Sequence, residues 1–363
     1  MLWVSLLLFA FLLLLPSRVR VQGRVTARRE ETFPGRPGTA RLALELMAPV
    51  PVYYRVECAG VAALGLLPRQ YLGFGMGRVR LVEELTLSPR RRGAHALPRV
   101  RVFVRDVFGV WEREVPTAVI QGQVRVYPRV YPVPRPDLAL TLLAEGPEVR
   151  GVGLEDPTQF RGVRPYAPGD PVRHVHWRAT ARAGTLMVRE FGRVRATGIW
   201  VHLDTSGTGA VYLDHAAELA ASLLVRANEE RLLVALSAPG GMVPLARGDE
   251  AVRRALGVLA ELEAEAAPRP VPIPPPGVNL VILTQHAPVA VVDGALKARS
   301  RAARVHLIAL PEGFYLRPGE RGRPLFGKPD AVLRLLKKRA VLEQEGVFVH
   351  LLRGDDALAR LSG

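Results

Sequence analysis

The chain has 363 residues, a formal net charge of +16 and a single cysteine, Cys58. This length suffices for two ordinary domains with separate cores, and 48% hydrophobic with 23% charged residues excludes a largely disordered protein. One cysteine excludes an internal disulfide and any multi-cysteine zinc site. The arginines are spread along the whole chain, which favours a generic basic surface, but the strong charge keeps nucleic acid as an alternative partner.

Residues 2–15 (LWVSLLLFAFLLLL) form an unbroken apolar run, which Pro16 and five arginines between positions 18 and 29 follow. As a helix the run would span about 21 Å, less than the roughly 30 Å hydrocarbon core of a bilayer. A signal peptide would have this length, but the sequence shows neither a basic region before the run nor a small-x-small cleavage site after it. The run also has no polar face, which argues against a helix packed on the core of a globular domain.

The position of the arginines therefore predicts a cell-membrane anchor over residues 1–22, with the bulk of the chain in the cytoplasm. The shortness of the run also suggests that membrane sequence is missing upstream.

The region 23–135 alternates apolar and polar residues in short segments, as half-buried strands do. Turn signals separate the segments at Pro34-Gly35, Pro37-Gly38, 73–77 and 90–93. The pattern predicts a β-sandwich of immunoglobulin-like size. Its expected strands are 24–30, 39–46, 50–60, 77–87, 99–106, 113–120 and 123–130.

The region 198–363 changes to a β-α-β rhythm, in which near-continuous apolar strands alternate with amphipathic helices. Such a pattern predicts a Rossmann-like α/β domain with a parallel sheet covered on both faces. The expected strands are 198–205, 231–238, 278–284, 303–310 and 347–352, and the expected helices are 210–230, 249–266, 294–303 and 330–346.

Residues 136–197, between the two domains, combine a proline-rich linker with a distinctive segment, FRGVRPYAPGDPVRHVHWRATARAGTLMVREF, at 160–191. Asp170 and Pro171 have the residue types of an N-cap and a first helical position, and Gly184 has that of a C-cap. They predict a helix from Pro171 to Gly184, followed by a strand. Trp177 and Tyr166 allow two interpretations, either core residues or part of a partner-binding surface.

This segment resembles a bacterial family known only as domain-of-unknown-function family 58, which is found with MoxR-type AAA+ ATPases. A second segment similar to the family is VRDVFGVWERE, with Asp106, Phe108 and Gly109, and a third is VRVYPRVYPV. Gln159 and Pro165 depart from the family, which often has acidic residues at these places. The matching residues are Phe160, Gly162, Arg164, Tyr166, Pro168, Gly169, Asp170, His176, Trp177, Arg178, Ala181 and Arg182.

The resemblance implies a membrane protein whose residues 198–363 form a von Willebrand factor type A-like domain. It also implies that the protein is a scaffold or adaptor for a MoxR-type AAA+ ATPase. Arg164, Tyr166, Gly169, Asp170, His176, Trp177, Arg178 and Arg182 are the motif residues that could form a partner surface.

Asp204, Ser206 and Thr208 follow the first expected parallel strand, where open α/β sheets bind ligands. Their spacing is similar to the metal-ion-dependent adhesion motif of type A domains, and one carboxylate with two hydroxyls suits Mg²⁺. The family motif adds a threonine and a second aspartate, but here Thr284 is followed by Gln285. The set is therefore incomplete, and the alternative is that Asp204 orders the loop while Ser206 caps the next helix.

The sequence contains no Walker P-loop, HExxH motif, nucleophile elbow or paired-carboxylate signature. His174 and His176, two residues apart on the expected helix, do not share a face and predict no metal pair. We therefore expect a membrane-anchored, non-enzymatic scaffold without a small-molecule substrate, and a basic nucleic-acid-binding protein is the alternative.

Overall fold

The computed structural model describes residue 3 and residues 18–110, 112–132, 155–167, 175–193, 197–325, 327 and 330–357. The chain divides into two compact units, Met1–Arg129 and Val130–Gly363. Most of the expected membrane anchor lies outside the described residues. Within the described ranges, no helix has the length and apolarity needed to cross a bilayer.

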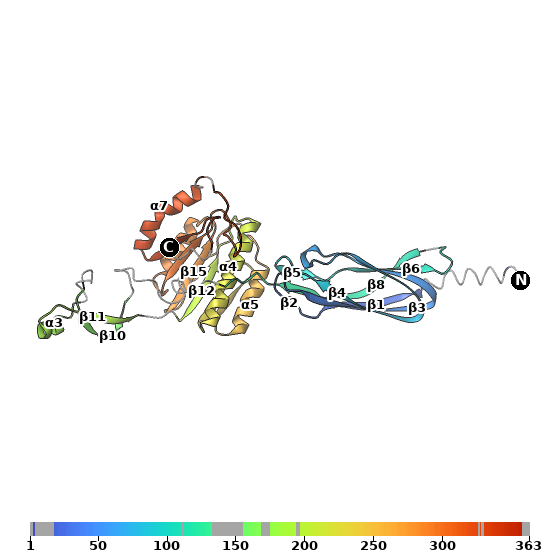
Figure 1. The fold of residues 1–363 in the computed structure, drawn as a ribbon, viewed down its shortest axis with the longest axis horizontal. Coiled ribbons are helices and arrows are strands. Elements are labelled where there is room, and N and C mark those ends of the chain that lie inside the picture. Colours follow the sequence, from blue (N-terminus) through green and yellow to red (C-terminus); the bar gives the residue numbers. More distant parts are fainter. Residues whose placement is uncertain are drawn as a thin grey trace. The chain divides into compact units, whose positions relative to one another are not determined.

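The N-terminal unit is rich in β-structure and is built around one long ribbon of two strands (Figure 1). β3 (Gly38–Cys58) pairs antiparallel with β4 (Arg69–Leu87) along nearly its whole length. β1 (Arg20–Ala27), β6 (Val100–Asp106), β7 (Glu112–Val115) and β8 (Thr117–Gln121) complete this six-stranded sheet. A three-stranded sheet contains β2 (Glu31–Thr32), β9 (Gln123–Val126) and β5 (Gly93–Ala96).

The β3–β4 ribbon bends where its register breaks, between Ala48 and Val52. Before the break β3 pairs with β1, and after it β3 pairs with β6. Leu46, from before the break, and Val56, from after it, line the same small internal cavity and belong to one core. The two halves of the ribbon therefore face each other across that core, as a bulge that bends a strand pair allows.

The sequence correctly predicted a β-rich N-terminal domain and its turns at Pro34-Gly35 and before β5, but it divided the long ribbon into short strands. The expected strands 39–46 and 50–60 are one strand, and the expected turn at 73–77 lies inside β4. At Gly73 a Cβ atom would come within 2.2 Å of the Tyr54 ring, so the glycine permits close packing and not a chain reversal. β1 begins at Arg20, three residues before the expected start of the domain.

The C-terminal unit contains a six-stranded sheet in the order β14-β13-β12-β15-β16-β17. All neighbours pair in parallel except β14, which is antiparallel to β13. Every residue of β15 is buried, as expected for a strand covered on both faces. The strands are β12 (Gly198–Leu203), β13 (Leu233–Ala238), β14 (Gly241–Ala246), β15 (Val278–Thr284), β16 (Val305–Ala309) and β17 (Val347–Leu351).

Helices lie on both sides of this sheet (Figure 1). α4 (Ala210–Glu229) and α5 (Asp249–Ala260) pack on β12, β13 and β14, whereas α6 (Val289–Ala298) and α7 (Asp330–Gln344) share a core with β15, β16 and β17. The expected parallel sheet with alternating helices is thus confirmed. The sequence did not predict β14, and it extended the second helix six residues past its end at Ala260.

The distinctive segment forms a small hairpin, β10 (Glu155–Pro165) with β11 (Met187–Arg193), and a short helix, α3 (Trp177–Ala183). Pro171, the predicted helix start, lies outside the described residues. The predicted unbroken helix to Gly184 is wrong, because Val175 makes a β-bridge with Val188 and α3 begins at Trp177. Gly184 ends the helix in the left-handed conformation, as predicted.

Candidate functional site at the carboxyl edge of the parallel sheet

Asp204 lies at the carboxyl end of β12, next to the carboxyl end of β15. Leu203 pairs with Leu283, so the following residues, Asp204 and Thr284, lie side by side. The chain continues from β12 to β13 on one side, and β15 lies on the other. This is the topological switch point of the sheet, where open α/β folds bind ligands.

The Asp204 carboxylate is buried, and a hydroxyl group holds each of its oxygens. The Thr284 hydroxyl donates to Oδ2 at 2.6 Å, and the Ser206 hydroxyl donates to Oδ1 at 2.6 Å. The Ser206 backbone N–H also donates to Oδ1, at 3.1 Å. Charge-assisted hydrogen bonds of this kind fix the carboxylate in one orientation.

Three hydrogen bonds hold the loop that follows Asp204. The Tyr212 hydroxyl donates to the Asp204 carbonyl at 2.9 Å, and burial raises the pKa of Tyr212 well above its usual value. The Thr208 hydroxyl donates to the Thr205 carbonyl at 2.9 Å. The Gly207 N–H donates to the Glu265 carbonyl at 3.0 Å. The loop is thus an ordered platform for the Asp204 carboxylate.

These contacts test the alternative interpretation, in which Asp204 orders the loop and Ser206 caps the next helix. α4 begins after Gly209, and no side chain caps it. The expectation that Ser206 caps this helix is therefore wrong, because its hydroxyl is engaged with Asp204. The expectation that Asp204 orders the loop agrees with the two bonds from Ser206.

His202, on β12 two residues before Asp204, is a neighbouring titratable side chain. His202 is buried, and its Nδ1 lies 3.2 Å from the Ser237 hydroxyl oxygen. Burial lowers the pKa of His202 to about 4, against the opposing influence of the Asp204 carboxylate. His202 is therefore neutral at pH 7 and offers no positive charge to the Asp204 carboxylate.

The donor set fits Mg²⁺ in kind, because Asp204, Ser206 and Thr284 gather three oxygen side chains within hydrogen-bond distance. The Thr208 hydroxyl adds an oxygen on the same loop. A further acceptor, Gln285 Oε1, is buried without a hydrogen-bond partner in the described structure. Among the described residues no three acidic, histidine or cysteine side chains cluster, and within this oxygen set Asp204 is the carboxylate.

Thr284 is the residue that the sequence analysis missed. It was noted only because Gln285 replaces an aspartate of the family motif. The available signal was positional: Thr284 ends the strand beside β12 at the same register as Asp204. Parallel strands bring their carboxyl ends to one edge, and that rule alone could have placed the two residues together.

The motif residues on the hairpin form a separate, exposed group. The Trp177 side chain is 66% exposed and α3 has no buried residue, which disfavours the interpretation of Trp177 as a core residue. His176 caps the helix, because its Nδ1 accepts from the Ala179 N–H at 3.1 Å. Arg178 and Arg182 lie one helical turn apart and share a face.

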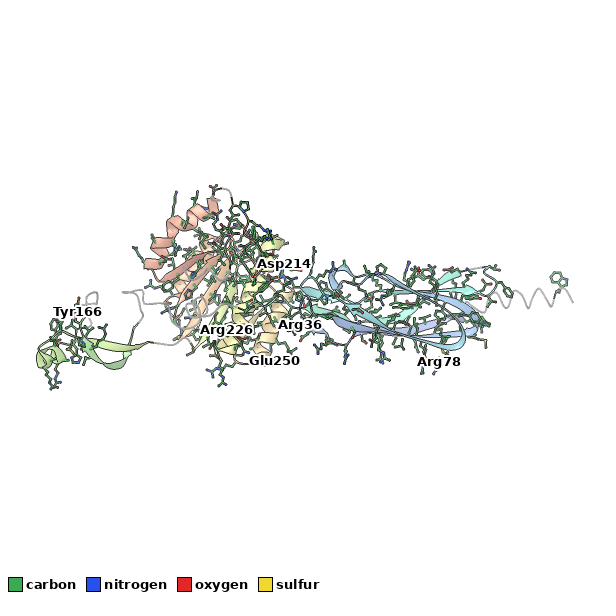
Figure 2. The ribbon with its side chains drawn as sticks, viewed as in Figure 1. Arg36, Arg78, Tyr166, Asp214, Arg226 and Glu250 are labelled. Carbon is green, nitrogen blue, oxygen red and sulfur yellow. The ribbon has the colours of Figure 1, made fainter. Side chains whose placement is uncertain are left out.

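Two further motif residues lie on the same hairpin. Arg164 and Tyr166 are exposed, and Tyr166 is labelled in Figure 2. Gly169 and Asp170 lie outside the described residues, so the hairpin brings together only part of the predicted surface.

Residues 162–274 match the family described as "Protein of unknown function DUF58". This range includes Asp204, Ser206, Thr208 and most of the hairpin, and it ends before Thr284. No match was found among curated proteins.

Solved structures with partial similarity include a non-cellulosomal cohesin from the archaeon Archaeoglobus fulgidus, at 14% identity and a TM-score of 0.22, covering 30% of this chain and 91% of that one. The CARDB domain of a Pyrococcus furiosus protein, solved with di-metal ions, has 12% identity and a TM-score of 0.20, with 30% and 91% covered. A PapD-like domain of human CEP192 has 19% identity and a TM-score of 0.19, with 28% and 82% covered.

Proposed function

We propose that the protein is a membrane-anchored, non-enzymatic scaffold whose C-terminal unit binds a protein partner in the manner of a von Willebrand factor type A domain. The observation that carries the proposal is the Asp204 carboxylate, oriented by Ser206 and Thr284 at the switch point of a parallel sheet. The partner implied by the family resemblance is a MoxR-type AAA+ ATPase, on the cytoplasmic side of the membrane.

The residues at the carboxyl edge of the parallel sheet are suited to binding a partner and not to catalysing a reaction. Ser206 and Thr284 use their hydroxyl protons to hold the carboxylate still, and Tyr212 holds the backbone beneath it. If Mg²⁺ binds, Asp204 with the Ser206, Thr208 and Thr284 hydroxyls would hold it, and the ion would offer an open position to an acidic group of the partner. With a single carboxylate, we expect Mg²⁺ affinity no tighter than about millimolar.

The test is the binding of a purified MoxR-type ATPase to the full chain, with and without Mg²⁺, for the wild type and two variants. Asp204→Asn removes the charge but keeps the side-chain size. Asp214→Asn removes a charge from the exposed side of α4 and serves as the control (Figure 2). We expect Asp204→Asn to weaken binding by about tenfold or more, which corresponds to about 1.4 kcal/mol, while Asp214→Asn leaves it unchanged. Equal affinity for both variants would reject this edge as the binding site.

The net charge of +16 supports nucleic acid as a second candidate partner. On α3 the exposed Trp177 offers an aromatic ring, and Arg178 and Arg182 offer two cations on a neighbouring face. Proteins that bind single-stranded nucleic acid combine these two kinds of side chain. Such binding must weaken steeply with salt because counterions are released. An affinity for a labelled oligonucleotide that is unchanged between low and high salt would exclude this candidate.

A further inference from the structure

One end of the N-terminal unit carries a concentration of exposed apolar side chains. The bend of the β3–β4 ribbon and the turn between β6 and β7 form this end, which we call the tip. The two parts meet because Val52, just after the bend, pairs with Asp106, the last residue of β6. The exposed apolar residues of the tip are Met47, Tyr53, Phe74, Met76, Val107, Phe108 and Val110.

The tip side chains are far more exposed than large apolar residues usually are. Phe74, Met76 and Phe108 are 57%, 63% and 67% exposed. Phe74 and Tyr53 face each other across the ribbon, with ring centroids 4.9 Å apart, so they form a continuous aromatic surface. A grouped apolar surface of this kind marks an interaction site, whereas single exposed apolar residues do not.

The β6–β7 turn holds its apolar residues outward by a fixed local structure. Asp106 is buried, and its side-chain carboxylate accepts a hydrogen bond from the Phe108 N–H at 3.1 Å. The backbone carbonyl of Asp106 accepts one from the Gly109 N–H at 3.1 Å. Gly109 has a φ of +71°, a conformation that a glycine adopts without strain. The turn therefore presents Phe108 to the outside as an ordered projection.

The chain enters the N-terminal unit at this same end. Arg20, the first residue of β1, pairs with Met47 at the tip. In the sequence only residues 16–19 separate β1 from the apolar run 2–15. A bilayer that held this run would therefore lie next to the tip.

The charged residues around the tip are complementary to anionic lipid. Exposed arginines surround the apolar surface, and Figure 2 shows Arg78 near this end of the unit. The nearby carboxylate of Glu45 pairs with Arg78, and that of Glu112 pairs with Arg55. The exposed arginines are Arg18, Arg20, Arg78, Arg105 and Arg113.

We propose that the tip inserts its apolar side chains into the interfacial layer of a phospholipid bilayer, with the arginines against lipid phosphates. This proposal rests on the membrane anchoring in the proposed function. An apolar surface bounded by basic residues is the combination that binds in the plane of a membrane surface, about 5–10 Å deep. The tip would then fix the orientation of the N-terminal unit on the membrane, because it adds a second point of attachment to the anchor.

The experiment uses the full chain reconstituted with vesicles of phosphatidylglycerol and phosphatidylethanolamine. A bimane label is attached at Phe108→Cys, and the matched control carries it at Arg36→Cys, at the opposite end of the same unit (Figure 2). The native Cys58 is buried, and burial raises its pKa, so the introduced thiol reacts selectively. Quenching by doxyl groups on the lipid chains reports contact with the bilayer.

We expect bimane at position 108 to be quenched at least about twofold more than at position 36, as insertion to the interfacial depth requires. Equal quenching at both positions, in protein that floats with the vesicles, would overturn the tip proposal while leaving the anchor intact. Failure to float with the vesicles would reject the anchor itself and the tip proposal with it.

A second set of variants separates lipid insertion from contact between two copies of the chain. Phe74→Ser and Met76→Ser are combined with bimane at Val110→Cys, and an unchanged melting temperature shows that the fold is intact. We expect quenching by lipid to fall to the level of the Arg36→Cys control. Quenching that stays high in this variant would show that Phe74 and Met76 do not hold the tip in the bilayer, which contradicts the proposal. Vesicle-bound protein that crosslinks at position 108 as a dimer without quenching would contradict insertion.

Discussion

β15 and β4 are both strands with many apolar residues, but they occupy opposite environments. All seven residues of β15 are buried, whereas β4 has buried residues only near its end, at Leu85 and Leu87. The difference follows from what covers each strand: β15 has a strand on each side and helices on both faces, whereas β4 contributes one face to the core of a two-layered β-unit. Apolar character alone therefore does not show whether a side chain supports the fold.

The largest expected effect comes from shortening a buried side chain of β15. Ile282→Ala removes three carbon atoms from a fully buried site and should lower the free energy of unfolding by about 2–5 kcal/mol. Leu72→Ala on β4 is the control, because Leu72 is 77% exposed, and should change it by about 0.5 kcal/mol or less. Urea unfolding of the full chain, followed in each unit by hydrogen exchange, measures the change for both variants. Similar losses of unfolding free energy in the two variants would contradict the difference between β15 and β4.

An acid titration should also separate the two units. Burial lowers the pKa values of His202, His215 and His350 to about 4 and that of His306 well below its usual value, and all four lie in the C-terminal unit. The unfolded chain takes up protons on these groups below about pH 6.5 while the folded unit does not, so stability falls as the pH drops from about 6.5 to 4.

For His202 alone this loss is on the order of 3 kcal/mol. The measurement is chemical unfolding between pH 7 and 4, in which His202→Gln should reduce the pH dependence of the C-terminal unit. A pH dependence that the variant leaves unchanged would show that His202 is not neutral in the folded state.

A smaller loss of stability is expected at Gly73 of β4, where the space for a side chain is limited although the strand is largely exposed. In Gly73→Ala the added methyl group would overlap the Tyr54 ring, and we expect a loss of about 1–3 kcal/mol from overpacking. Combining it with Tyr54→Leu should recover part of that loss, because the ring is then absent. Gly38→Ala is the control, since the nearest atom to its added Cβ is 4.0 Å away. Equal melting temperatures for both glycine variants would contradict this account.

The parallel sheet was predictable because burial on both faces leaves a continuous apolar run, as in VNLVILT of β15. The ribbon was predictable only as alternating strands. Its bend lies at a register break opposite Met76, and Gly73 of β4 packs against the Tyr54 ring of β3. From the local sequence alone, the glycines at 73, 75 and 77 look the same as those of a turn.

The candidate site divides in the same way. Asp204, Ser206 and Thr208 form a local pattern and were predicted from spacing. Thr284 comes from a strand about eighty residues later, and only the pairing of β12 with β15 brings it to Asp204. Similarly, β14 was missed because Gly241 and Pro244 suggest a loop, and its pairing with β13 is visible only in the fold.

The bend in the β3–β4 ribbon has a consequence for solubility. Among the described strands, β4 pairs with β3 alone and leaves a nineteen-residue strand with a free edge. A long, flat edge of that kind is a template on which another chain can add a strand and begin aggregation. The register break and Gly77, with its φ of +73°, interrupt that edge, and Arg80 and Glu84 place charges along it. The same bend that closes the core therefore also shortens the regular edge on which a second molecule could add a strand.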